Sequence, residues 1–216
     1  MMNEGERKTL RAWMEGKGLR ALMARIFELG ETGMAEAADA PGPRGRTRLA
    51  LDDADAEARD RLTTWMRGLD LEIRVDAIGN IFGVLPAAPG GEDRAPLMIG
   101  SHIDTVGNAG PLDGVYGVLA GLTVLHAFRA VGVLPPRPLI VTAFTNEEGV
   151  RYQPDMMGSL VYAGGCPLEK ALDTRGMDGS RLGDELERIG YAGTVPPGHV
   201  TPFAYLELHV EQGPAL

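Results

Sequence analysis

Cysteine is almost absent from this sequence, since Cys166 is the single cysteine among 216 residues. One thiol cannot form an intrachain disulfide, which excludes a disulfide-stapled fold and fits a reducing compartment. Cys166 also has no neighbouring base within the segment 164–167. We therefore interpret it as an incidental thiol and not as a catalytic nucleophile.

Long apolar runs and basic clusters are missing as well. No stretch is apolar enough to predict a transmembrane helix, and the charged N-terminus leads into an amphipathic segment instead of the apolar core of a signal peptide. Lys and Arg number 21 against 30 Asp and Glu, which gives a formal net charge of −9. Nucleic acids and anionic membranes select basic surfaces, so neither is an expected partner. We expect a cytoplasmic protein.

Two common catalytic motifs are also missing. The sequence contains no Gly-x-Ser-x-Gly nucleophile elbow and no glycine-rich phosphate loop followed by Lys and Ser or Thr. Glycine and proline, in contrast, are abundant at 30 and 15 residues. They lie mostly at turns beside strand-like runs, which indicates a loop-rich α/β fold and not a disordered chain.

Apolar periodicity predicts alternating helices and strands along the chain. From residue 97 onward this alternation indicates βαβ units and a largely parallel sheet, preceded by a hairpin. We expect Asp52 or Asp53 to cap the second helix and Ser180 to cap the last. The predicted helices cover residues 7–29, 53–69, 115–131, 156–163, 168–172 and 181–189, and the predicted strands cover 71–75, 81–85, 97–101, 139–144 and 204–208.

Histidine and carboxylate residues directly follow three of the predicted strands, which we expect to be buried. Sites in open α/β sheets form outside the carboxyl ends of the strands, so these side chains should meet at one edge of one sheet. Imidazole and carboxylate together suit zinc, manganese and similar divalent ions, and a free carboxylate beside such ions can act as a general base. The pattern therefore favours metal-assisted hydrolysis. The residues are His102 with Asp104, Glu147 with Glu148, and His209, and Asp113 lies just before the helix predicted at 115–131.

Each of these groups taken alone also has a simpler interpretation. His102 can be a strand-end histidine that hydrogen-bonds to its neighbours, and Asp113 can be the N-cap of the following helix. Glu147 and Glu148 can form a solvated acidic loop, although two adjacent carboxylates favour a compensating cation or proton. Two further histidines lack carboxylate neighbours, and we interpret them as structural or exposed: His126 and His199.

Six segments of the sequence carry a resemblance to a known family: DAIGNIFG (76–83), GSHIDTV (100–106), LDGVYGVLAG (112–121), TNEEGVRY (145–152), MMGSLVYAGG (156–165) and LELHVEQGP (206–214). Together they resemble the hydantoinase/carbamoylase family of amidases. This group includes N-carbamoyl-L-amino-acid hydrolases, allantoate amidohydrolases and β-ureidopropionases, and it belongs to the aminoacylase-like and carboxypeptidase-like dinuclear metallohydrolases. The resemblance runs from about residue 8 to the end of the chain.

The resemblance implies two divalent metal ions and assigns their ligands. His102 and His209 resemble the terminal ligands of one metal, and Asp113 resembles the carboxylate that bridges both metals. Glu148 resembles the ligand of the second metal. The ions implied in this way are zinc, or manganese, cobalt or nickel.

The resemblance also implies roles beside the metals. Glu147 resembles the general base, Asp104 resembles the carboxylate that orients His102, and Gln212 is similar to a residue near the substrate. The implied reaction is hydrolysis of a linear amide or ureido C–N bond through a water that bridges the metals. Its small-molecule substrate is of the N-carbamoyl-amino-acid or allantoate type.

The fold implied by the resemblance is a three-layer α/β/α catalytic domain with a mostly parallel, mixed sheet. Family members are longer, because their chains continue into a lid domain that mediates homodimerisation and then return with a final histidine ligand. We therefore expect residues 1–216 to be the N-terminal part of an incomplete catalytic domain, with the lid domain expected after residue 216. The alternative is a catalytically inactive truncated fragment or a partial metal-binding module.

Overall fold

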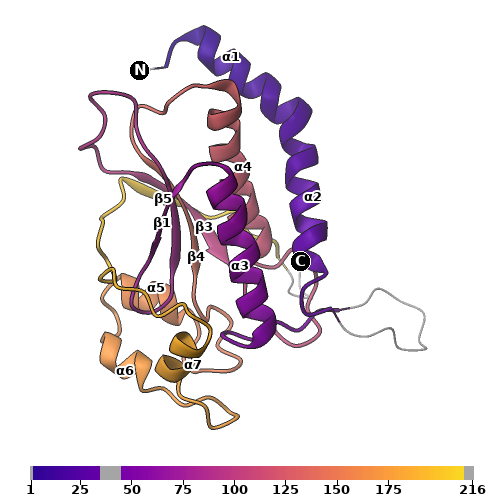
Figure 1. The fold of residues 1–216 in the computed structure, drawn as a ribbon, viewed down its shortest axis with the longest axis vertical. Helices are drawn as coiled ribbons and strands as arrows, with labels where there is room; N and C mark the ends of the chain where they lie inside the picture. Colours follow the sequence, from indigo (N-terminus) through magenta and orange to yellow (C-terminus); the bar gives the residue numbers. More distant parts are fainter. Residues whose placement is uncertain (1, 35–44, 212–216) are drawn as a thin grey trace, which may run out of the picture.

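A five-stranded sheet forms the centre of the computed structural model, which describes residues 2–34 and 45–211 (Figure 1). The strand order is β1-β2-β4-β3-β5. β3 pairs in parallel with β4 and β5, whereas β2 pairs antiparallel with β1 and β4, so four strands share one direction and β2 opposes them. The sheet is therefore mixed and mostly parallel, as predicted. The strands are β1 Glu72–Val75, β2 Ile81–Leu85, β3 Leu97–His102, β4 Leu139–Phe144 and β5 Ala204–Leu206.

The helices lie in two groups around this sheet. α1 to α4 cover one face, to the right in Figure 1, and α5 to α7 gather near its lower end. The first helix predicted from the sequence is continuous but contains one π-helical segment, η1, so it is divided into α1, η1 and α2. The bounds are α1 Glu4–Trp13, η1 Met14–Gly18, α2 Leu19–Gly30, α3 Asp53–Gly68, α4 Val115–Val131, α5 Met157–Tyr162, α6 Leu168–Leu172 and α7 Leu182–Arg188.

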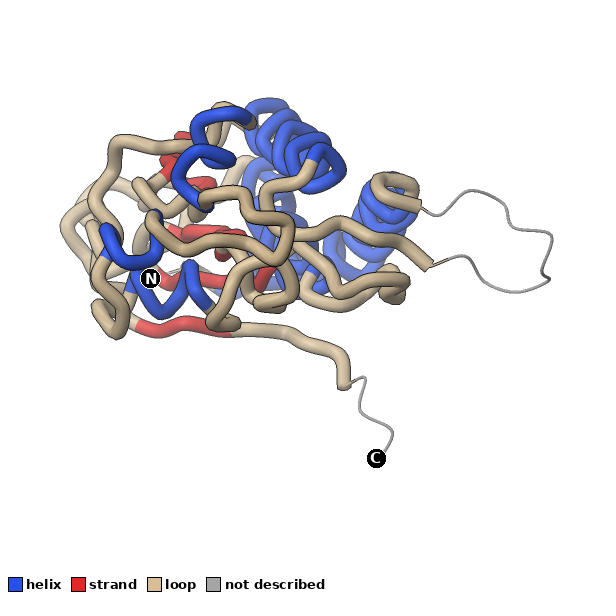
Figure 2. The backbone as a smooth tube through the Cα atoms, turned by 90° about the horizontal axis from the view of Figure 1, so that it is seen from below, coloured by secondary structure: helices blue, strands red, loops and turns tan. Residues whose placement is uncertain are grey.

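The two faces of the sheet carry cores of different size. The larger core packs α1 to α4 against alternate residues of the strands, such as Ile81 and Val141. The smaller core lies on the opposite face, and its partly buried neighbours are Tyr162 at the end of α5 and Val200 in a loop. This face therefore has a thinner helical cover than the first (Figure 2). The residues of the smaller core are Phe82, Val84, Met98, Ile140 and Phe144.

Small residues bring α4 close to the sheet. A Cβ atom on Gly121 would lie 3.1 Å from side-chain atoms of Ile99 and Val141, and one on Gly117 would lie 2.9 Å from Cβ of Ser101. Both glycines therefore permit an approach that a larger residue would block. The N-terminus of α4 is held in this way against the carboxyl end of β3.

Three details differ from the sequence predictions. The last helix has Arg181 as its N-cap with no side-chain cap, because the hydroxyl of Ser180 instead bonds to Asp178 and Tyr152. The final strand ends at Leu206 and not at residue 208. It also lies at the edge of the sheet, where Leu206 is 53% exposed, so only two of the three strands that precede the polar residues are buried.

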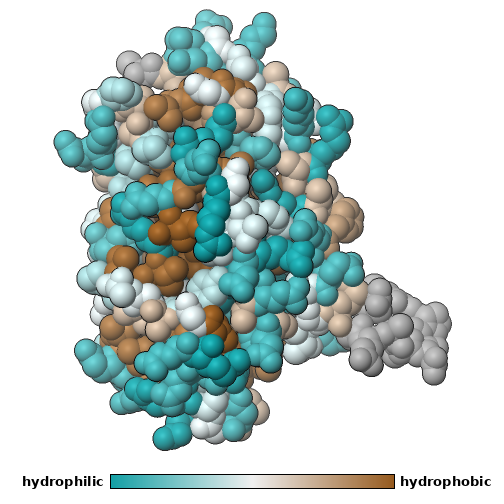
Figure 3. Space-filling view, viewed as in Figure 1, coloured by the Kyte–Doolittle hydropathy of each residue, from teal (hydrophilic) through white to brown (hydrophobic). Residues whose placement is uncertain are grey.

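Hydrophobic side chains are visible on the face seen in Figure 3, mainly in its left half, between hydrophilic groups. The lower end of the same view is mostly hydrophilic. Within residues 2–34 and 45–211, no helix has both the length and the apolarity that a membrane span requires.

Candidate metal centre

His102 is the last residue of β3, and its side chain is 1% exposed. Its Nδ1 lies 2.9 Å from the backbone oxygen of Asp104. Since a carbonyl oxygen can only accept, Nδ1 carries the proton in this hydrogen bond, and Nε2 keeps a free lone pair. Burial lowers the pKa of His102, but the carboxylates of Asp104, Glu147 and Glu148, together with the hydrogen bond to the backbone of Asp104, raise it above its usual value.

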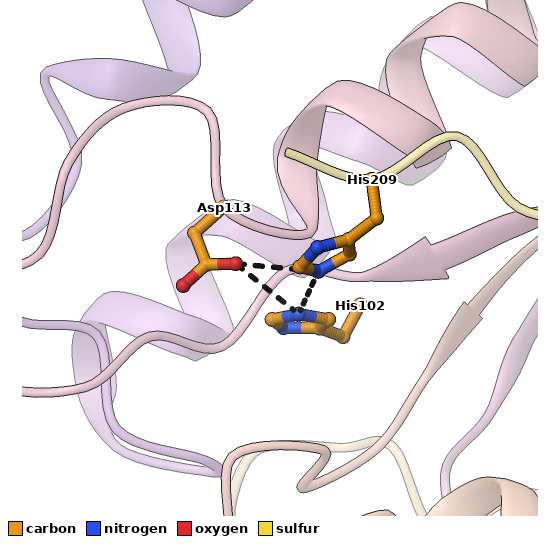
Figure 4. Close-up of side chains that lie close together, drawn as sticks. All are labelled: His102, Asp113 and His209. Atoms are coloured by element: carbon orange, nitrogen blue, oxygen red, sulfur yellow. Dashed lines mark hydrogen bonds and ion pairs between the residues drawn. The ribbon is translucent and has the colours of Figure 1, made fainter. Parts of the chain in front are cut away.

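Asp113 and His209 meet His102 at this Nε2 atom (Figure 4). The Nε2 atoms of the two imidazoles lie 3.4 Å apart, and Oδ1 of Asp113 lies 3.2 Å from His209 Nε2 and 3.9 Å from His102 Nε2. Nδ1 of His209 bonds to the carbonyl of Val210 at 2.8 Å, which again leaves Nε2 as the free nitrogen. Three potential ligand atoms thus point to one common region.

A second group joins His102 to the loop that follows β4. Glu147 Oε2 lies 3.4 Å from His102 Nε2, and ligand atoms of His102, Glu147 and Glu148 lie within 4.8 Å of one another. Burial raises the pKa of both glutamates, and with the nearby Asp113 it raises the pKa of Glu148 to about 7. Oε1 of Glu148 is buried without a hydrogen-bond partner. The close carboxylates therefore favour a proton or a cation beside them.

Asp104 connects the two groups through the backbone. Its carboxylate accepts the N–H groups of Glu147 at 3.3 Å and of Glu148 at 3.2 Å. Its distance to the imidazole of His102 is longer, 3.7 Å from Oδ1 to Nδ1. The imidazole is therefore oriented mainly by the backbone carbonyl of Asp104, whereas the carboxylate fixes the glutamate loop.

The sequence interpretation missed two residues that hold this loop from behind. Asn80 Oδ1 accepts the N–H of Thr145 at 2.9 Å, and Arg59 Nη2 lies 3.3 Å from the hydroxyl of Thr145. Arg59 is itself paired with buried Asp55 at 2.8 Å. The spacing of Asp55 and Arg59, four residues apart within one helix, is the sequence signal that predicts their pairing. No local sequence pattern predicts the contacts of Asn80 and Arg59 with Thr145.

Asp113 does not cap α4, in contrast to the simpler interpretation of this residue. The N-cap is Gly114, whose φ of +61° favours glycine. A Cβ atom on Gly114 would overlap Nε2 of His102. The turn before α4 is therefore in close contact with the imidazole of His102, and the carboxylate of Asp113 is free to face His209.

This donor set fits a divalent cation. Two imidazole nitrogens and a carboxylate converge, and such ligands suit zinc and similar ions. Two lone pairs that face each other at 3.4 Å are unfavourable unless a proton or a cation lies between them. The buried, unpartnered Oε1 of Glu148 points to the same requirement.

The two histidines interpreted as structural or exposed lie apart from this centre. His126 contacts Arg25 at 3.3 Å and packs edge-to-face on Trp13. His199 packs edge-to-face on Phe82. Neither belongs to a cluster of potential metal ligands within the part of the chain that the structure describes. Gln212 lies outside the described residues.

The sequence profile named Peptidase family M20/M25/M40 matches residues 98–216, which is more than half of the chain and includes the convergent histidines and carboxylates. The chain belongs to this family. M20 enzymes are metal-dependent and act on small-molecule substrates, and the chain supplies a possible ligand group for such a metal.

Relatives within the M20 family support the resemblance seen in the sequence. An N-carbamoyl-L-amino-acid amidohydrolase of Rhizobium meliloti is 41% identical over 172 residues, covering 80% of this chain and 41% of the relative. A ureidoglycolate hydrolase of Arabidopsis thaliana is 37% identical over 188 residues, covering 82% of this chain and 39% of the relative.

Solved structures agree with the relatives. A hydantoinase/carbamoylase family amidase of Burkholderia vietnamiensis superposes with a TM-score of 0.84 at 39% identity, covering 92% of this chain and 46% of that one. The resemblance to this amidase group and the α/β fold are therefore confirmed. The chain spans less than half the length of the relatives that it matches.

Proposed function

We propose that this chain is the N-terminal part of a metal-dependent amidohydrolase that cleaves a linear C–N bond in a carbamoyl or ureido group. One observation carries the proposal: His102, Asp113 and His209 direct ligand atoms to one region beside a glutamate pair. The names of the relatives support N-carbamoyl-amino acids or allantoate-type ureido compounds as substrates.

In this proposal His102, Asp113 and His209 hold one divalent ion, and Asp113 with Glu148 contributes to a second. The ions are zinc, or manganese, cobalt or nickel, which accept this mixture of imidazole and carboxylate. When bound, they supply Lewis acidity that polarises the substrate carbonyl and lowers the pKa of the attacking water.

Glu147 is the proposed general base. Its side chain is 32% exposed, so it is sheltered and still open to a substrate, and burial raises its pKa toward the range of a useful base. It takes a proton from the attacking water and passes it to the leaving nitrogen. Asp104 keeps this carboxylate in place, because it accepts the N–H of Glu147. Ammonia and carbon dioxide are the expected products of the carbamoyl group.

The remaining proposals concern the parts of the protein beyond this site. Residues 1–216 form the N-terminal part of a catalytic domain, and the greater length of the relatives supports a lid and dimerisation domain after it. Gln212 contributes to substrate binding, and the complete protein is a homodimer. The cytoplasmic location expected from the sequence stays a prediction.

A fusion tests the proposed reaction. Residues 1–216 are joined to the C-terminal part of the Rhizobium meliloti relative, and ammonia release from N-carbamoyl-L-amino acids and from allantoate is followed with added zinc or manganese. We expect metal-dependent turnover, and Glu147→Gln should lower kcat by about 10³-fold while metal content is unchanged.

Exposed Glu187 offers a matched control, since Glu187→Gln should leave turnover unchanged. A folded fusion that releases no ammonia from either substrate class would contradict the proposed function. Near-normal turnover in Glu147→Gln would instead contradict the assignment of the base.

A further inference from the structure

A hydrogen bond between Ser101 and Glu207 joins the two segments that carry the imidazoles. The Ser101 hydroxyl donates to Oε1 of Glu207 at 2.5 Å across 106 positions of sequence. Ser101 is buried at the end of β3, immediately before His102. Glu207 follows β5 and lies two residues before His209. The two bonded residues are therefore close in sequence to the two histidines.

The position of His209 depends on a contact between its segment and the sheet more than the position of His102 does. The regular pairing of β3 with β5 ends at the pair of Ile99 and Leu206, and His209 lies three residues further along an irregular segment. Its side chain is 39% exposed, against 1% for His102. The Nδ1 hydrogen bond of His209 goes to the next residue of the same segment, so it does not fix that segment to the sheet.

Glu207 is held as an acceptor on both carboxylate oxygens. The hydroxyl of Tyr205 donates to Oε2 at 2.9 Å, while Ser101 donates to Oε1. Burial and the charge of Glu207 raise the pKa of Tyr205, so this hydroxyl stays a donor across the physiological range. Among the described residues, Glu207 belongs to neither group of potential metal ligands.

We propose that Ser101 and Glu207 are positioning residues that set His209 against His102. This inference rests on the proposed metal centre. A metal site requires its nitrogen atoms at fixed separations, and hydrogen bonds behind the ligands typically change metal affinity by about 10- to 100-fold. The bond from Ser101 to Glu207 fixes the segment 207–209 to β3 and thereby sets the 3.4 Å separation of the two Nε2 atoms.

Zinc affinity of the 216-residue chain tests the inference. The dissociation constant for Zn²⁺ is measured by competition with a chromophoric chelator at one pH for the parent, Ser101→Ala, Glu207→Ala and Glu207→Gln. We expect the two alanine variants to bind Zn²⁺ about tenfold more weakly. Glu207→Gln keeps an amide oxygen that accepts from Ser101, so it should stay within about threefold of the parent.

A thermodynamic cycle with His209→Ala shows whether the effect passes through this histidine. Ser101→Ala should cause no further loss of affinity once His209 is removed, because the serine acts by placing that ligand. The inference is overturned if Ser101→Ala weakens binding equally in both backgrounds. It is also overturned if Glu207→Ala binds Zn²⁺ as the parent does.

Two controls separate this inference from the metal centre itself. If His102→Ala and His209→Ala weaken binding while Ser101→Ala and Glu207→Ala do not, the positioning role alone is wrong. If His102→Ala binds as the parent does, the proposed centre is wrong. Ser159→Ala, at a half-buried serine whose hydroxyl bonds within its own helical turn, should match the parent, and melts in EDTA check that each variant folds.

Discussion

The Nε2 atoms of His102 and His209 lie 3.4 Å apart, although the residues are separated by 107 positions in the sequence. Each Nδ1 is bonded to a backbone carbonyl, so each Nε2 directs a lone pair toward the same region. Asp113 adds a carboxylate oxygen 3.2 Å from His209. This relationship favours a shared cation, and the predictions below depend on it.

Metal content is the first expected outcome. In the proposed centre, His102, Asp113 and His209 are three protein ligands for one ion. The sequence resemblance assigns only Asp113 and Glu148 to a second ion. The 216-residue chain should therefore retain about one equivalent of zinc after gel filtration, and His102→Ala should retain much less. His126→Ala, outside the centre, should match the parent. Two equivalents of tightly held metal would contradict this ligand count.

Gly114 should be sensitive to a single added methyl group. A Cβ atom there would overlap Nε2 of His102, so Gly114→Ala should displace the imidazole and weaken Zn²⁺ binding at least about tenfold. Gly132 closes the other end of α4 with a similar positive φ of +69°, and a Cβ atom there would meet nothing within 4 Å. Gly132 lies in the left-handed region with a ψ of +24°, whereas Gly114 has a ψ of −50°, so Gly132→Ala adds a methyl group at a positive φ without any overlap with an imidazole. Equal metal affinities in the two variants would refute a steric effect on His102.

The stability of the metal-free chain should fall as the pH rises. Burial raises the pKa of Glu148 from 4.5 to about 7, so between these values the folded state binds more protons than the unfolded state. The free energy of unfolding then decreases with pH across this window, by about 1–2 kcal/mol after allowance for solvent screening. Urea unfolding in EDTA at pH 5 and pH 8 measures this change. Glu148→Gln should reduce the difference in unfolding free energy between the two pH values. An unchanged difference would contradict the raised pKa of Glu148.

Several features of the fold were accessible from the sequence because they depend on local patterns. The apolar runs at 115–131 and 139–144 became α4 and β4 with those bounds, since periodicity and length distinguish a helix from a buried strand. Asp52 caps α3, because a carboxylate before an apolar helical pattern satisfies free N–H groups. The placement of polar residues after the strands also follows from the chain order.

Other features depend on contacts between distant segments. Arg59 reaches Thr145 across 86 positions, and Ser101 reaches Glu207 across 106. No periodicity reports such contacts, because they arise only when helices and strands pack. The conformation of Gly114 was missed for a different reason, since a positive φ at a helix start replaces the aspartate cap that local statistics favour.

The buried pair of Arg59 and Asp55 should matter for stability far more than an exposed pair on the same helix. Arg59→Met leaves the carboxylate of Asp55 buried without its partner, which should cost about 3–5 kcal/mol of unfolding free energy. Arg61→Met breaks exposed pairs with Glu28 and Glu57 and should cost less than about 1 kcal/mol. Urea denaturation of both variants gives the comparison. Similar losses of unfolding free energy in the two variants would show that burial does not increase the contribution of the Arg59–Asp55 pair to stability.

Anomalous scattering from crystals grown with Zn²⁺ tests most directly whether these side chains bind a divalent ion. Data collected on both sides of the zinc absorption edge locate the ion without reference to activity. The account predicts a peak at roughly 2.0–2.2 Å from Nε2 of His102, Nε2 of His209 and a carboxylate oxygen of Asp113. A zinc peak held by other residues, or no peak beside these three at saturating Zn²⁺, would contradict it.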